Sequence, residues 1–125
     1  MSRTRTLQES LSHAAEGILY ALKTQRNMRL LAATGALIMA LGVVCGVEPL
    51  EWLFLGGAIA ALLFAELMNT AIEVFADHIT GGSQRADIKH MKDIAAGAVL
   101  VTVINAAVVS TVIFLPYLRA TPWWE

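Results

Sequence analysis

Three stretches of the chain are almost free of charge, and each is long enough to cross a lipid bilayer. The first covers 30–47 and ends where Pro49 disfavours helical geometry in the residue before it. The second covers 52–79, and the third covers 94–118 and is expected to stop near Pro116. A helix needs about 20 mainly apolar residues to span the hydrocarbon core. The pattern therefore predicts three transmembrane helices.

A shorter stretch, 6–24, has single apolar residues at helical spacing. They lie three or four positions apart and form one stripe of a helix: Leu7, Leu11, Ala14, Ile18 and Leu22. Thr6 and Glu9 have the spacing of a capping box. We expect an amphipathic helix on the membrane surface; the alternative is a helix packed on a soluble partner protein. Residues 1–29 lack the apolar core of a signal peptide.

The segment 80–93 is polar and contains the pair Gly81-Gly82, which favours a loop. The sequence has no internal repeat and no low-complexity tract. The prediction is therefore a single domain over 1–125. It is an all-α membrane protein with one N-terminal surface helix and three transmembrane helices.

Composition supports a membrane protein. Hydrophobic residues make up 57% of the chain and charged residues 15%, whereas about a quarter of a soluble domain is charged. The net charge of −1 offers no basic surface for nucleic acid. Cys45 is the single cysteine and cannot form an internal disulfide. These values exclude a soluble enzyme, a disulfide-stapled secreted module and a nucleic-acid-binding protein.

Lysine and arginine are distributed unevenly. Residues 1–29 carry five and 80–93 carry three, whereas 48–51 carry none and the C-terminal tail carries Arg119 alone. Cytoplasmic loops are enriched in these residues, so we expect the N-terminus and the 80–93 segment to be cytoplasmic. The tryptophans then fall at the outer interface, where indole rings are frequent: Trp52, Trp123 and Trp124.

Four polar residues interrupt the second apolar stretch: Glu66, Asn69, Glu73 and Asp77. At 100° per residue they lie within about an 80° arc on one face of a helix. An ionisable group at mid-membrane costs about 2.5–3.5 kcal/mol on insertion scales. This face must therefore contact protein, water, a cation or a substrate.

Several chemistries suit such a face. Carboxylates bind Mg²⁺ together with phosphate oxygens, and a carboxylate shielded from water can act as a general base. A row of carboxylates can also relay protons or bind a transported cation. Lys92, near the end of the polar segment, could neutralise phosphate. The structural alternative is a Glu–Lys pair that closes the end of the helix bundle.

Two motifs are more specific than the face itself. Residues 66–73 read Glu-Leu-Met-Asn-Thr-Ala-Ile-Glu, with Asp77 four positions further on, and residues 92–99 read Lys-Asp-Ile-Ala-Ala-Gly-Ala-Val. Together with 15–18 and 26–29, they resemble the small prokaryotic diacylglycerol kinase and undecaprenol kinase family. The resemblance covers nearly the whole chain.

The resemblance implies a homotrimer in the bacterial inner membrane, with active sites at subunit contacts near the cytoplasmic face. The implied reaction transfers the γ-phosphoryl group of ATP, with Mg²⁺, to the hydroxyl of a membrane lipid. Phosphoryl transfer depends mainly on positioning and charge neutralisation. Carboxylates that hold a metal, and a lysine beside them, are suited to that task.

The resemblance also implies roles for individual residues. Glu66 is expected to be the general base toward the lipid hydroxyl, and the other members of the catalytic cluster are Asn69, Lys92 and Asp93. Nucleotide contacts are implied for Gly17, Asn69, Glu73, Asp77 and Lys92. Metal binding is implied for Glu73 and Gln25.

The sequence departs from the family pattern at two places. Gln25 stands where the family usually has a second metal-binding glutamate, and an amide oxygen can coordinate a cation but lacks the negative charge. The connection from Asp77 to Lys92 is longer than expected by a residue and lacks the usual Glu-Tyr-His element near the nucleotide.

The lipid acceptor is indicated by smaller similarities. Residues 26–27, 51–54 and 93–97 look more like the undecaprenol branch of the family than the diacylglycerol branch. We therefore expect an undecaprenol kinase. Two alternatives remain open: a diacylglycerol kinase of the same family, and a catalytically degenerate or non-enzymatic membrane protein that binds or transports a cation.

Overall fold

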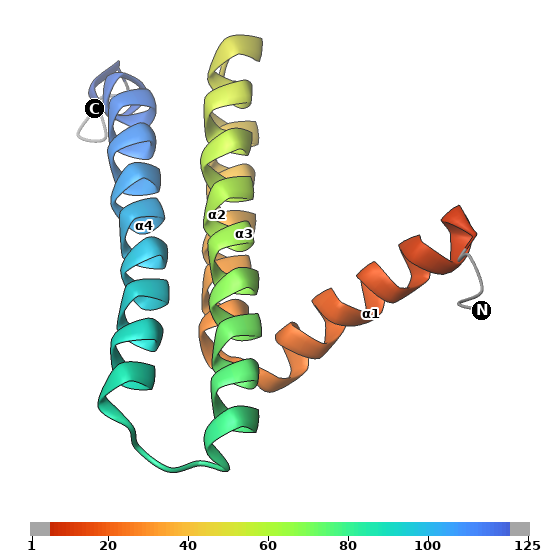
Figure 1. Cartoon of the computed structure of the whole chain (residues 1–125). Coiled ribbons are helices and arrows are strands. Elements are labelled where there is room, and N and C mark those ends of the chain that lie inside the picture. Colours follow the sequence, from red (N-terminus) through yellow and green to blue (C-terminus); the bar gives the residue numbers. More distant parts are fainter. Residues whose placement is uncertain (1–5, 121–125) are drawn as a thin grey trace.

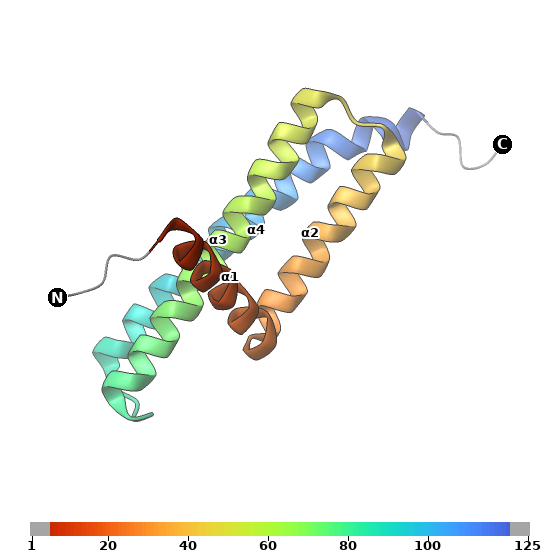
Figure 2. The same cartoon turned by 90° about the vertical axis from the view of Figure 1, so that its right-hand side faces the viewer.

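Helices account for nearly all of the described chain. The computed structural model describes residues 6–120, and its four helices are α1 (Leu7–Thr24), α2 (Arg26–Cys45), α3 (Pro49–Thr80) and α4 (Ala86–Ala120). The helices α2, α3 and α4 form a bundle in which α3 makes most of the contacts, and α1 leaves it at a steep angle (Figure 1, Figure 2). Each bundle helix is long and apolar enough to cross a membrane. The three predicted spans are confirmed.

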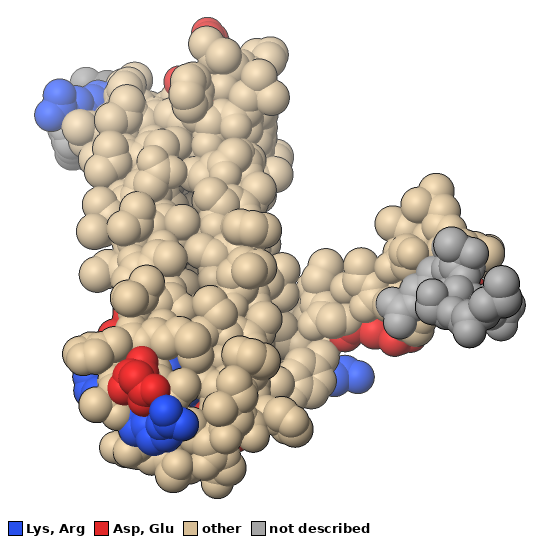
Figure 3. All heavy atoms as spheres, in the orientation of Figure 1, with Lys and Arg blue, Asp and Glu red and all other residues tan. Residues whose placement is uncertain are grey.

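The two ends of the bundle differ in charge. We call the end where α2 begins and the 81–85 turn lies the inner end, and the end with the 46–48 turn and the end of α4 the outer end (Figure 1). Figure 3 shows charged side chains gathered at the inner end and on α1, with a few more at the outer end and none along the visible face of the shaft between the two ends. Helix α1 joins the bundle at the same end as the 81–85 turn (Figure 1).

Helix α1 begins as its sequence predicts. The Thr6 Oγ1 accepts a hydrogen bond from the Glu9 amide at 3.2 Å, and the Glu9 Oε2 accepts one from the Thr6 amide at 3.0 Å. The predicted capping box is therefore confirmed. Leu7, Leu11 and Ile18 of the apolar stripe are exposed. Because this chain does not cover the stripe, α1 has the free apolar face that a surface helix needs.

One residue separates α1 from α2. Gln25 has extended geometry, with φ −104° and ψ 118°. The Arg29 Nη1 donates to the carbonyl oxygens of Leu22 and Lys23, at 3.1 Å each, and so satisfies two of the free carbonyls at the end of α1. Helix α2 consequently begins at Arg26, earlier than the apolar stretch 30–47 on which its prediction rested.

The predicted 80–93 loop is too long. Helix α3 runs through Thr80 and ends at Gly81, whose φ of 59° is left-handed, and α4 begins at Ala86. The connection is therefore only 81–85, and the third long helix begins before the predicted start at 94. The cause is that polar residues end a membrane span without ending a helix. An i, i+4 pair of Lys89 and Asp93, 2.6 Å apart, supports this polar extension.

The expected stop at Pro116 is also wrong. Helix α4 continues past Pro116 to Ala120. A proline removes one backbone donor and crowds the preceding turn. In membrane helices, neighbouring groups can satisfy the carbonyl that is freed, so the helix can continue.

The core of the bundle lies at its outer end. Val47, Leu55, Ile113 and Phe114 form a buried apolar cluster, with Trp52 packed against it. The ring of Trp52 also covers Gly42 so closely that a Cβ there would come within 2.6 Å of a ring carbon. Small residues of this kind let membrane helices approach each other. Gly42 therefore fixes how closely α2 and α3 pack.

Candidate active site

Three polar side chains are buried on α3 in the inner half of the bundle. Glu66, Asn69 and Thr70 are 2%, 6% and 5% exposed. Their Oε2, Oδ1 and Oγ1 atoms have no hydrogen-bond partner among the described residues. Buried polar atoms in proteins are nearly always paired, and one left unpaired costs about 1–3 kcal/mol. Three such atoms within two turns of one helix mark this segment as incomplete without a further molecule.

The rest of the predicted polar face emerges toward the inner end. Glu73 is half-buried and the Asp77 side chain is 62% exposed. Burial therefore decreases along the face from Glu66 to Asp77, over about 16 Å of helix at 1.5 Å per residue. The face connects a buried carboxylate with the charged surface at the inner end.

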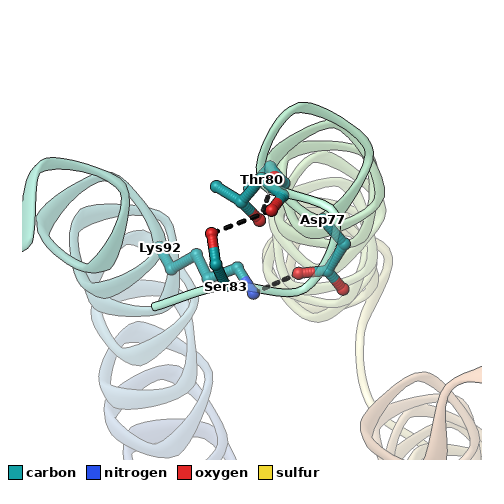
Figure 4. A network of polar contacts seen from close by, with 5 residues as sticks. Asp77, Thr80, Ser83 and Lys92 are labelled. Atoms are coloured by element: carbon teal, nitrogen blue, oxygen red, sulfur yellow. Dashed lines mark hydrogen bonds and ion pairs between the residues drawn. The ribbon is translucent and has the colours of Figure 1, made fainter. Parts of the chain in front are cut away.

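Lys92 and Asp77 meet at the inner end of the bundle. The Lys92 Nζ lies 2.5 Å from the Asp77 Oδ1, and this pair joins α4 to α3 (Figure 4). The structure therefore brings these two predicted site residues together. The sequence also allowed a purely structural role, in which a glutamate–lysine pair closes the end of the bundle. The pair found here has that position, but its carboxylate belongs to Asp77. Because the pair is open to solvent, it contributes little to the stability of the fold.

Asp93 lies apart from the buried residues. Its carboxylate accepts a hydrogen bond from the Lys89 Nζ at 2.6 Å, and both side chains are exposed. The pair lies along α4 and makes no bond to α3. In the described chain Asp93 is therefore not part of one cluster with Glu66 and Asn69.

A polar cavity of about 460 Å³ lies beside the 81–85 turn. Asp77 and Lys92 line it together with Ser83, Arg85 and Lys89. The turn is held by the Ser83 hydroxyl, which donates to the Thr80 carbonyl oxygen at 2.8 Å (Figure 4). The volume is that of a small-molecule site, and the three cations suit phosphate oxygens. Sequence analysis did not single out Arg85 or Lys89, although both follow the Gly81-Gly82 pair closely.

A second, mainly apolar groove of about 800 Å³ lies between α1 and α3. Gly17 and Ile18 line it from α1, and Thr70, Val74 and Phe75 line it from α3. Gly17, implied as a nucleotide contact, is therefore placed in this groove and not in the polar cavity. Sequence analysis found neither the groove nor Thr70, because their significance depends on where α1 crosses α3.

The two residues implied as metal ligands make no hydrogen bond through their side chains to any described residue. Glu73 lies on α3, and Gln25 lies at the junction of α1 and α2. Within residues 6–120, no three His, Cys, Asp or Glu side chains converge on one point. Mg²⁺ often takes only one or two protein carboxylates and completes its shell with phosphate oxygens and water. The donors present fit that mode of binding and not a cage made by this chain alone.

Comparison with known proteins gives a consistent picture. Residues 12–114 match the family described as prokaryotic diacylglycerol kinase. The undecaprenol kinase of Bacillus subtilis (strain 168) is 34% identical over 110 residues, which cover 88% of this chain and 89% of that protein. The diacylglycerol kinase of Synechocystis sp. (strain ATCC 27184 / PCC 6803 / Kazusa) is 35% identical over 107 residues, which cover 86% of this chain and 61% of that protein.

The match covers every feature of the site described above, from Gly17 on α1 to the end of the 92–99 motif. A nucleotide phosphate donor and a lipid acceptor are the substrates of such enzymes. The chain is a multi-pass membrane protein that belongs to the prokaryotic diacylglycerol kinase family of lipid kinases.

Proposed function

We propose that this protein transfers the γ-phosphoryl group of ATP to the hydroxyl of undecaprenol, in the inner membrane of a bacterium. The observation that carries the proposal is Glu66, a carboxylate buried on a membrane-spanning helix with its Oε2 unpaired. The preference for undecaprenol is supported by the Bacillus subtilis undecaprenol kinase, which is matched along 89% of its length. The Synechocystis diacylglycerol kinase is matched along 61%.

In the proposed reaction, the Glu66 carboxylate accepts the proton of the lipid hydroxyl. The hydroxyl oxygen forms a bond to the γ-phosphorus of ATP, while the bond from that phosphorus to the β,γ-bridging oxygen breaks. ADP leaves and Glu66 then releases its proton to water. Asn69, buried one turn from Glu66 with its Oδ1 unpaired, holds the reacting groups in position. A general base of this kind contributes about 10²–10⁴-fold to a rate.

The phosphates of ATP are proposed to bind at the inner end. Lys92 can exchange its contact with Asp77 for a phosphate oxygen, since both side chains are partly exposed. Arg85 and Lys89 line the same cavity and add positive charge. When bound, Mg²⁺ would offset the negative charge of the phosphates, with Glu73 and Gln25 as its proposed protein ligands.

A homotrimer with a cytoplasmic N-terminus is part of the proposal. One observation supports an assembly. The buried polar atoms on α3 lack partners among the described residues of one chain. The cationic residues at the N-terminus and around the 81–85 turn support the orientation. Asp93, paired with Lys89 on the outside of one chain, could then meet a neighbouring subunit.

The test is phosphate transfer from γ-labelled ATP in detergent–lipid micelles that contain Mg²⁺ and either undecaprenol or diacylglycerol. Micelles without an acceptor lipid are the control. Label in undecaprenol, above that in diacylglycerol, is the expected result. Label in diacylglycerol alone would overturn the acceptor. Label in neither lipid, from folded protein, would overturn the kinase assignment in favour of a degenerate site or a cation-binding protein.

A further inference from the structure

Thr70 differs from every other threonine in the described helices. The hydroxyls of the other five each donate to a backbone carbonyl three or four residues earlier, at 2.7–3.0 Å: Thr24, Thr34, Thr80, Thr102 and Thr111. Such a bond is the usual way in which a helix satisfies a threonine hydroxyl. Thr70 is 5% exposed, and its Oγ1 has no partner. Its hydroxyl therefore has a hydrogen bond left to make.

The surroundings of Thr70 indicate the chemistry of that molecule. Thr70 lines the groove of about 800 Å³ between α1 and α3, two helices that cross each other in Figure 2. Apolar side chains make up most of the lining, among them Ile18, Leu67, Val74 and Phe75. A hydrocarbon chain fits this lining, and Thr70 provides a single hydrogen-bonding point within it.

The position of Thr70 relative to Glu66 indicates which part of the ligand it meets. The two residues are four positions apart on α3, so they lie about 40° apart on one face and about 6 Å apart along the axis. Both are buried and both have an unpaired oxygen. Thr70 lines the groove and Glu66 does not, so a hydroxyl bound at Thr70 lies about one helical turn from the carboxylate.

We propose that Thr70 is a substrate-positioning residue that hydrogen-bonds the acceptor hydroxyl of the lipid in the α1–α3 groove. This inference rests on the proposed function, because it concerns the same lipid acceptor, held about one turn of α3 from the proposed base. It also predicts a property that a general base alone does not require. The groove should bind a lipid alcohol more tightly than a lipid of equal length that lacks the hydroxyl.

The kinetic test uses Thr70→Val, which keeps the shape of the side chain and removes the hydroxyl. We expect the KM for the lipid to rise about three- to tenfold, the size of one neutral hydrogen bond, with a smaller change in the KM for ATP. Thr70→Ser should restore the lipid KM. Thr34→Val is the matched control, because its hydroxyl is already bonded to the Leu30 carbonyl at 2.9 Å. An unchanged lipid KM in Thr70→Val would overturn the inference.

A binding test without ATP separates this inference from the kinase assignment. A long-chain alcohol that carries a diazirine is photo-crosslinked to the protein in micelles, beside the same molecule with the hydroxyl replaced by a methyl group. Wild type should label about three- to tenfold more with the alcohol, and Thr70→Val and Thr70→Ala should label equally with both. Equal labelling by wild type, or discrimination that survives in both variants, would overturn the role of Thr70. A wild type that discriminates but phosphorylates no lipid would instead overturn the proposed function.

Discussion

At the outer end of the bundle, buried and half-buried polar groups are paired. The Tyr117 hydroxyl donates to the Glu51 Oε2 at 2.6 Å, and the same oxygen accepts from the Glu48 amide at 2.9 Å. In the inner half, Glu66 and Asn69 are buried with oxygens that have no partner. Within residues 6–120, the buried polar atoms that lack a partner therefore all lie in the inner half, which requires another molecule. Substitutions at the two ends should therefore change different properties of the protein.

Removal of divalent cations should have the largest effect on phosphate transfer, and it should leave the stability of the outer end unchanged. Chelation with EDTA is expected to lower phosphate transfer to background, because Glu73 and Asp77 would otherwise repel the phosphates of ATP. The unfolding temperature in detergent should stay the same, since the outer core contains no charged ligand set. Added Mg²⁺ should restore transfer. Transfer that persists in the chelator would contradict a metal role.

Gly42→Ala should have the next largest effect, on stability alone. A Cβ at Gly42 would come within 2.6 Å of the Trp52 ring, and overpacking of this kind costs about 1–3 kcal/mol. Gly56→Ala is the control, since a Cβ there meets nothing within 4 Å. Thermal unfolding in detergent should separate the two variants. Equal unfolding temperatures would show that the α2–α3 contact is not as close as described.

Tyr117→Phe should lower the unfolding temperature slightly, through loss of its hydrogen bond to Glu51. Glu51 keeps its bond to the Glu48 amide, so the N-terminus of α3 should remain capped. Turnover per folded protein should not change. A loss of turnover without a loss of stability would mean that the outer end also serves the reaction.

Gln25→Glu should give the smallest effect, at the inner end. The added charge is expected to lower the Mg²⁺ concentration at half-maximal activity by about two- to fivefold, the size of one partly exposed charge interaction. Gln25→Ala should raise it. A titration that neither substitution changes would remove Gln25 from the metal site.

Much of this fold follows from sequence periodicity, and the differences have identifiable causes. The capping box of Thr6 and Glu9 was predicted because it depends on local spacing alone. The start of α4 at Ala86 was missed, because hydropathy reports the membrane boundary and not the end of the helix. Pro116 was treated as a stop, although a proline can lie inside a membrane helix.

The candidate site was predictable where it lies on one helix. The face that carries Glu66, Asn69 and Asp77 follows from 3.6 residues per turn. Contacts between elements were less accessible: the Asp77–Lys92 pair and the cavity near Arg85 depend on the course of the 81–85 turn. Thr70 could not be singled out, because an unpaired hydroxyl in the described helices is recognised only when the hydrogen bonds are known.

The most direct test of the account is to measure turnover and unfolding temperature together for Glu66→Gln. The amide keeps the shape of the side chain but cannot accept the proton, so turnover should fall about 10²–10⁴-fold. Stability should stay equal or rise, because an amide is less costly to bury without a partner than a carboxylate. Full turnover in Glu66→Gln would contradict the assignment of the base. A loss of turnover accompanied by unfolding would show that the unpaired carboxylate serves the fold and not the reaction.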